Sequence, residues 1–107
     1  MPSENIRGNE TDIPVQISGF SDLDDSEKAA INKIIVNYIK RYKEITLNMQ
    51  RFELHLKKIH AQEKSEKYQI DAKLRDSGKV YGASLVGRHL LTAVDEVLKK
   101  IEHEISK

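Results

Sequence analysis

The chain has no cysteine and no long apolar segment. The absence of cysteine excludes disulfide bonds and metal sites built from thiolates, and it fits a reducing compartment. No apolar run approaches the roughly 20 residues that a transmembrane helix needs. The polar residues 1–5 lack the apolar core of a signal peptide. We therefore expect a cytoplasmic protein with no membrane partner.

Motifs for catalysis and cofactor binding are also missing. The chain has no phosphate-binding loop and no glycine pattern of a dinucleotide site, and residues 82–87 lack the G-x-S-x-G spacing of a nucleophile elbow. Four histidines are scattered, and no pair has metal-binding spacing with a carboxylate as third ligand: His55, His60, His89 and His103. We expect no enzyme activity, no metal, no cofactor and no small-molecule substrate.

Charge is distributed unevenly along the 107 residues, although the net charge is only +1. Residues 1–32 carry two Lys/Arg against seven acids, a net −5. Residues 33–75 carry eleven against five, a net +6, and residues 76–107 carry five of each. Local basic clusters, rather than the isoelectric point, meet phosphate, although a solvated lysine-rich surface explains the same composition. The length predicts one domain over residues 12–107, preceded by a disordered tail at residues 1–11.

The first half of the domain predicts a strand followed by a helix. Residues 13–20 place apolar side chains at every second position, and Pro14 suits the start or edge of a strand. Asp24, Asp25 and Ser26 are N-cap candidates for a helix that continues to residue 43 or 44. Its apolar stripe has helical spacing: Ile31, Ile34, Ile35, Tyr38, Ile39 and Tyr42.

Two alternating segments follow, at residues 51–57 and 67–75. Strict alternation of apolar and polar side chains is typical of antiparallel strands with one solvated face. Residues 61–66 are polar and predict the connection between these strands. Residues 76–78 predict a tight turn, because Gly78 can adopt positive φ.

The last strand and helix complete the domain. In residues 80–86 the period alone does not decide which side chains are buried, and Gly82 indicates a bulge or a close approach. The final helix begins near Arg88 or His89. Leu91, Val94, Leu98, Ile101 and Ile105 form its apolar stripe, widened by Leu90 and Val97. The order β–α–β–β–β–α predicts an α+β fold, similar to double-stranded-RNA-binding domains, with a four-stranded mixed sheet and two helices packed on one face.

The outward faces of the predicted strands are charged and lack aromatic residues. An RNA-recognition motif would need stacking aromatics there. Arg51, Lys57, Lys73 and Arg75 stand there instead, and Tyr38 and Tyr42 are better explained as core. We expect contacts to phosphates and to nucleic-acid shape rather than base readout.

Over residues 13–106 the chain resembles the short form of the ribosome hibernation-promoting factor and protein Y family. The resemblance is most specific from Lys67 onward: the outward-charged strand, the Asp-Ser-Gly turn at 76–78, the small-residue strand, and then Leu-Leu-Thr-Ala-Val-Asp at 90–95 opening the last helix. Glu96, Glu102 and Glu104 dilute that helix, and Gly-Arg-His at 87–89 stands where the family usually shows an acidic residue.

The resemblance implies a non-catalytic factor that binds rRNA of the small ribosomal subunit at the decoding region and blocks tRNA and mRNA. It implies roles in translation regulation, ribosome hibernation and the stress response. Basic residues of the two helices would contact phosphate: Lys33, Lys40, Arg41, Lys43, Arg88, Lys99 and Lys100. Lys57, Lys58 and Lys73 on the strands complete the expected RNA-binding set.

Two alternatives remain open. The first is a double-stranded-RNA-binding domain, whose order α–β–β–β–α requires residues 13–20 to lie outside the sheet. The second is a protein-interaction module, or a weak homodimer, that uses an open sheet edge.

Overall fold

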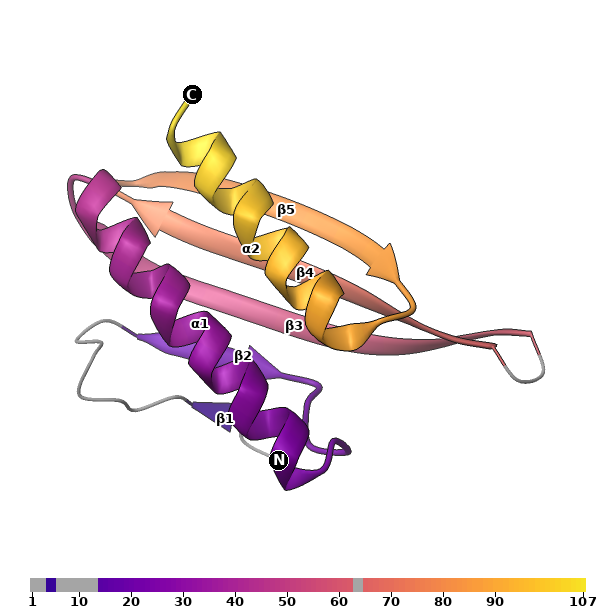
Figure 1. Ribbon diagram of the computed structural model, residues 1–107. Coiled ribbons are helices and arrows are strands. Elements are labelled where there is room, and N and C mark those ends of the chain that lie inside the picture. The colour runs from indigo at the N-terminus through magenta and orange to yellow at the C-terminus, as the bar shows by residue number, and fades with distance from the viewer. Residues whose placement is uncertain (1–3, 6–13, 63–64) are drawn as a thin grey trace.

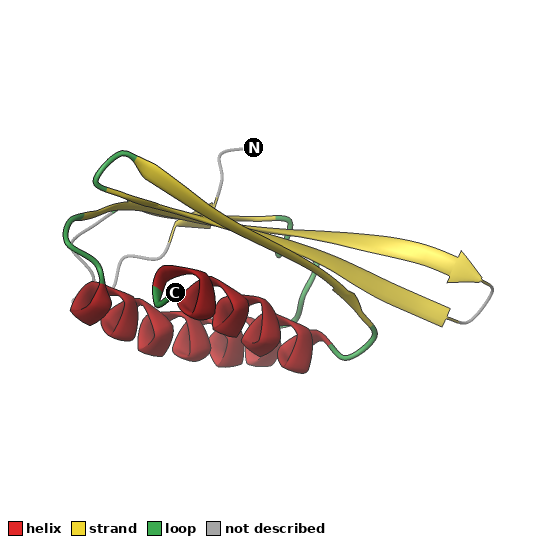
Figure 2. Cartoon of the chain, turned by 90° about the horizontal axis from the view of Figure 1, so that it is seen from above, coloured by secondary structure: helices red, strands yellow, loops and turns green. Residues whose placement is uncertain are grey.

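Two helices lie on one face of a mixed sheet (Figure 1, Figure 2). The computed structural model describes residues 4–5, 14–62 and 65–107, without the side chains of residues 4–5, 60–62 and 65–66. The elements are β1 (Glu4–Asn5), β2 (Val15–Ser18), α1 (Asp25–Ile45), β3 (Met49–Gln62), β4 (Ser65–Asp76), β5 (Lys79–Gly87) and α2 (Leu90–Ile105).

The predicted fold class is confirmed, and β1 adds two residues at one edge. The sheet order is β1-β2-β3-β4-β5, in which only β2 and β3 are parallel. A parallel neighbour requires a crossover, which α1 supplies between β2 and β3. The expected tail contributes β1, and its other residues lie outside those described, as does Ile13 of the predicted strand 13–20.

Helix α1 begins where the sequence predicts. Of the three N-cap candidates, Asp24 is the cap, and its carboxylate accepts a hydrogen bond from the Glu27 backbone N–H at 2.7 Å. This bond satisfies one of the amides that a helix start leaves without a partner. At the other end, the Thr46 backbone N–H and hydroxyl both donate to the Tyr42 carbonyl, at 2.9 and 2.8 Å.

The β3–β4 hairpin is longer than its side chains suggest. Residues 61–66, predicted as a connection, are mostly strand, with Gln62 paired to Ser65 and His60 to Glu66. The prediction was wrong because an antiparallel ladder depends on backbone amides, which continue to pair regardless of side-chain polarity. The far end of the hairpin extends beyond the helices (Figure 1).

The predicted turn at 76–78 is confirmed. Ser77 and Gly78 have φ of 53° and 86°, the left-handed pair that a two-residue hairpin loop between β4 and β5 favours. The buried Asp76 carboxylate accepts hydrogen bonds from the backbone amides of Asn48 at 2.7 Å and Leu47 at 3.3 Å. These bonds, chiefly that from Asn48, lower the pKa of Asp76 and tie the turn to the segment between α1 and β3.

The structure decides which face of β5 is buried and corrects the predicted buried face of α2. Tyr81, Ala83 and Leu85 pack partly against the core, and the alternate residues are exposed. No bulge occurs at Gly82, which pairs in regular register with Lys73. In α2, Leu91 is 41% exposed, so its place in the predicted stripe was wrong. The apolar arc of α2 is wider than one contact face, and the helix orientation decides which edge meets solvent. The buried residues are Leu90, Ala93, Val94, Val97, Leu98 and Ile101.

Candidate nucleic-acid interface

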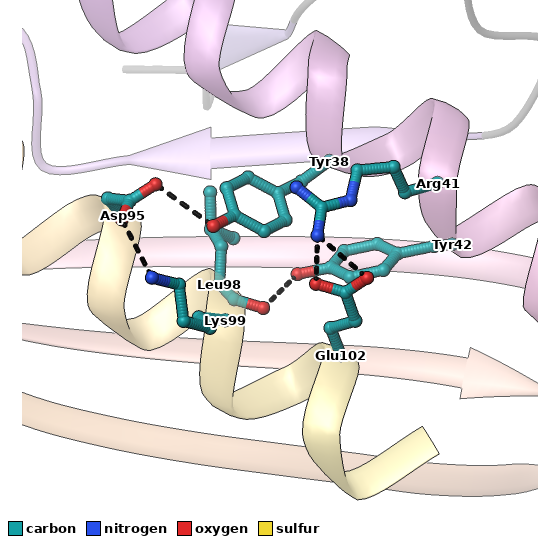
Figure 3. A network of polar contacts seen from close by, with 7 residues as sticks. All are labelled: Tyr38, Arg41, Tyr42, Asp95, Leu98, Lys99 and Glu102. Carbon is teal, nitrogen blue, oxygen red and sulfur yellow. Dashed lines mark hydrogen bonds and ion pairs between the residues drawn. The ribbon is translucent and has the colours of Figure 1, made fainter. Parts of the chain in front are cut away.

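Two tyrosines of α1 hydrogen-bond to α2 (Figure 3). The Tyr38 hydroxyl donates to Asp95 Oδ1 at 2.9 Å, and the Tyr42 hydroxyl donates to the Leu98 carbonyl at 2.6 Å. Because the paired positions advance together along both helices, α1 and α2 run in the same direction. Their C-terminal halves, which hold most of the predicted phosphate-binding residues, therefore lie side by side.

These tyrosines belong to the core, as predicted from their position in the apolar stripe. Tyr38 is 5% exposed and Tyr42 is fully buried. Burial raises the pKa of Tyr38 to about 12, with a further contribution from its hydrogen bond to Asp95. Burial also raises the pKa of Tyr42. Both hydroxyls therefore remain protonated donors at neutral pH, and neither ring is available as a stacking platform.

Arg41 is held between the helices. Its Nη2 donates to both carboxylate oxygens of Glu102, at 2.7 and 2.9 Å. Its guanidinium carbon also lies 4.8 Å from the centre of the Tyr38 ring. The Glu102 hydrogen bond raises the Arg41 pKa. Since the Arg41 side chain remains 54% exposed, the Arg41–Glu102 pair lies at the surface, with its positive charge balanced by the carboxylate.

Lys99 and Lys100 are both exposed residues of α2. Lys99 lies 3.8 Å from the Asp95 carboxylate, a loose and exposed pair that high dielectric and salt weaken. Lys99 and Lys100 both line a hollow between α2 and β5, together with Glu96 and Glu104. The acids of α2 therefore lie beside both of its predicted phosphate-binding lysines.

Three further lysines project from α1. Lys33, Lys40 and Lys43 are exposed. Lys33 and Lys40 are seven residues apart, which places them two turns apart on nearly the same face of the helix, about 10 Å along the axis. Lys43 lies toward a different side, because three residues correspond to about 300° of rotation. Lys33 and Lys40 thus form a basic row on the outer surface of the helix layer.

Two further basic residues, Lys58 and Arg88, lie apart from those of the helices, near the point where the β3–β4 hairpin begins to project. Lys58 pairs with Tyr68 across β3 and β4, and Tyr68 pairs with Gly87 across β4 and β5. Arg88 follows Gly87 directly, and both Lys58 and Arg88 are exposed. Strand register thus places two predicted residues that are 30 positions apart at the same end of the sheet, with β4 between them. Exposed Lys57 precedes Lys58, and successive side chains of a strand point to opposite faces.

Lys73 lies on the open face of the sheet, away from the helices. It is exposed, opposite Glu53 in the β3–β4 register. Arg51 on the same face donates from Nε to Glu53 Oε2 and from Nη2 to Gln16 Oε1, both at 2.5 Å. The open face therefore carries paired charges of both signs rather than a uniform basic surface.

Sequence reasoning missed a polar row on this face, which appears only once the register is known. Ser18 Oγ and His55 Nδ1 are 2.8 Å apart, and the Ser84 hydroxyl donates to Asp71 Oδ1 at 2.6 Å. His55 and Asp71 are cross-strand partners. The row lines a hollow of about 610 Å³. Alternation within each strand was the available signal, but it does not say which residues stand opposite each other.

Among residues 14–59 and 67–107, no three His, Asp or Glu side chains gather as metal ligands would. Within the described part of the chain, no helix is long and apolar enough to cross a membrane.

The fold is similar to that of a solved protein. No family model and no curated protein sequence matches the chain. Among solved structures, it is similar to a ribosomal subunit interface protein from Coxiella burnetii. The two share 16% sequence identity with a TM-score of 0.60, over 86% of this chain and 92% of that one. At this identity the likeness shows a common fold.

Proposed function

We propose that this chain is a non-catalytic, cytoplasmic factor that binds rRNA of the small ribosomal subunit and keeps idle ribosomes from translating. The observation that carries the proposal is the β–α–β–β–β–α fold, shared over most of both chains with a protein described as a ribosomal subunit interface protein. The residue patterns of the family resemblance support the same proposal.

The surface charges support the outer face of the helix layer as the rRNA contact. Lys33 and Lys40 project from it in a row, and neither forms an ion pair with an acid of the described residues, whereas Arg41 there is paired with Glu102. A bound arginine or lysine neutralises phosphate and releases counterions, which makes affinity fall with salt. On the open face, by contrast, Arg51 and Lys73 stand next to Glu53. The helix layer is therefore the better phosphate-binding candidate.

The test is co-sedimentation with ribosomes from the source cells on sucrose gradients at low and high salt. We expect the protein to migrate with small subunits or whole ribosomes at low salt and to be released at high salt. Protein that stays at the top of the gradient at low salt would overturn the proposal.

A matched pair of charge reversals tests the surface. Lys40→Glu should weaken binding, while Lys79→Glu should leave it unchanged, although each variant alters net charge equally. Both side chains are exposed, and Lys79 lies beside the β4–β5 turn, outside the predicted set. If one phosphate contact is lost, the slope of log K against log salt should flatten by about 0.7–0.9 for Lys40→Glu alone. Equal effects of the two variants would indicate nonspecific attraction.

The double-stranded-RNA-binding alternative is less well supported. It requires residues 13–20 outside the sheet, whereas β2 lies within it, paired with β3 through Val15–Phe52 and Ile17–Leu54. An excess of plain RNA duplex should therefore fail to displace the protein from ribosomes.

A further inference from the structure

Strand β5 presents an unusually regular edge. It is last in the sheet order and spans nine residues, Lys79–Gly87, in unbroken register with β4. Residues 80–86 contain no charged residue and no proline, the devices with which natural proteins block edge pairing. Val80 and Val86 are 50% and 53% exposed. The strand therefore offers a row of backbone groups with apolar side chains near both ends.

The sequence of this edge is complementary to itself when it is read in the opposite direction. In an antiparallel pair centred on Ala83, Val80 stands opposite Val86 of the other strand. Tyr81 stands opposite Leu85, Gly82 opposite Ser84, and Ala83 opposite itself. Each pairing joins two residues of like size or polarity. We propose that β5 pairs antiparallel with β5 of a second copy, about a two-fold axis at Ala83, and joins the two sheets into one.

This register is better than its neighbours. A slip by one residue would place the exposed valines on faces that do not match, because side chains alternate with period two. A slip by two would set Val80 opposite Ser84 and leave Val86 beyond the uncharged segment. A two-fold contact between identical patches also closes after two copies, so it predicts a dimer rather than a fibre.

The surroundings of the edge leave room for the second copy. A groove of about 650 Å³ lies between α2 and residues 82–85 of β5, so α2 does not seal the middle of the strand. Its α2 lining includes Glu96, Lys100 and Glu104, so two approaching copies would bring charges of both signs together. Nine paired residues span about 30 Å, and an interface of that kind falls in the small, reversible class below about 1,200 Å².

Disulfide trapping tests the register directly. The chain has no cysteine, so Ala83→Cys introduces one thiol, which the two-fold axis places opposite its own copy. Cα atoms directly opposite in an antiparallel pair are about 4.5–5.5 Å apart, within disulfide range.

Ser84→Cys is the matched control for this cross-link. In the proposed register Ser84 stands opposite Gly82, so position 84 of the second copy lies two residues further along the ladder. That offset adds about 7 Å along the strand to the distance across it, which exceeds the Cα separation that a disulfide spans. We expect mild oxidation to convert Ala83→Cys to a covalent dimer. The same cross-link should form at least tenfold more slowly in Ser84→Cys.

Charge exchange tests the same pairing without a cross-link. Val80→Glu and Val86→Lys, both at exposed positions, should each weaken the dimer about tenfold, since each alters two symmetric cross-strand contacts. Mixing the two variants should restore association, because the carboxylate introduced at position 80 of one copy faces the ammonium introduced at position 86 of the other. The double variant should restore it through two such pairs. Sedimentation velocity over a concentration series measures the dimer against the 12.3 kDa chain.

The proposal is overturned if the protein is monomeric at every concentration, or if Ala83→Cys cross-links no faster than Ser84→Cys. It is also overturned if mixing the charge variants rescues nothing while their circular dichroism matches that of the parent. These outcomes are independent of ribosome binding, because each is measured on the isolated protein in the absence of ribosomes.

Discussion

Gly19→Ala should destabilise the protein much more than Gly78→Ala, although both glycines have a φ of 86°. A Cβ on Gly19 would lie 1.9 Å from the Leu56 carbonyl oxygen and 2.9 Å from its carbon, both backbone atoms of β3. A Cβ on Gly78 would meet nothing within 4 Å. The two substitutions therefore share the backbone strain and differ in the collision.

The magnitudes follow from these two contributions. A left-handed conformation costs a residue with a Cβ about 1–2 kcal/mol, which is the whole expected effect at Gly78. At Gly19 the chain after β2 must also move away from β3, and forcing atoms into a packed region adds about 1–3 kcal/mol. The expected loss at Gly19 is therefore about 2–5 kcal/mol, a large part of the roughly 5–15 kcal/mol that stabilises a typical domain.

Urea unfolding followed by far-ultraviolet circular dichroism measures both variants. With a slope of about 1–3 kcal/mol per molar urea, Gly78→Ala should lower the midpoint modestly, and Gly19→Ala should lower it several times further or prevent folding. If Gly19→Ala lost no more stability than Gly78→Ala, the close approach of residue 19 to β3 would be refuted.

Three further predictions concern buried polar groups. Tyr42→Phe removes the hydroxyl that donates to Leu98 at 2.6 Å, and we expect a loss of about 0.5–1.5 kcal/mol in urea unfolding; an unchanged midpoint would contradict this bond. The pKa of Asp76 is lowered from 3.8, chiefly by the Asn48 amide, so its carboxylate stabilises the fold above pH 3.8 and this contribution is lost as the pH falls through the lowered pKa. Asp76→Asn should therefore flatten the acid limb of stability measured from pH 5 to 2, and an unaltered limb would argue against the assignment. The pKa of Tyr38 is raised from 10.0 to about 12, so stability should fall as the pH rises from 10 through 12; Tyr38→Phe should remove that part of the decline, as unfolding at pH 9 to 12 would show.

Much of the fold could be predicted because local side-chain patterns follow backbone geometry. Alternation at 51–57 and 67–75 identified two strands and their buried faces, and the turn at 76–78 was evident from its residues. The length of the β3–β4 hairpin could not be predicted, because backbone pairing extends through segments whose side chains are typical of loops. The exposure of Leu91 depended on how α2 sits against the sheet and α1.

In the candidate site, too, the residues and their elements could be predicted from the sequence, whereas their contacts with distant residues could not. Sequence alone supplied the basic residues, their segments and the helix on which Lys33 and Lys40 share a face. It could not show that Arg41 is held by Glu102, which lies 61 positions away, because that pair depends on two helices running in the same direction. The placement of Lys58 and Arg88 at the same end of the sheet likewise depends on strand register.

By itself, then, the sequence determined most of the strand and helix segments, the α+β order and the absence of cysteine. These follow from periodicity within single elements and from composition. Only the tertiary structure decided which charges are paired, which face of β5 is buried and which sheet edge stays open. Those properties depend on distances between residues far apart in the chain, and local periodicity carries no information about such distances.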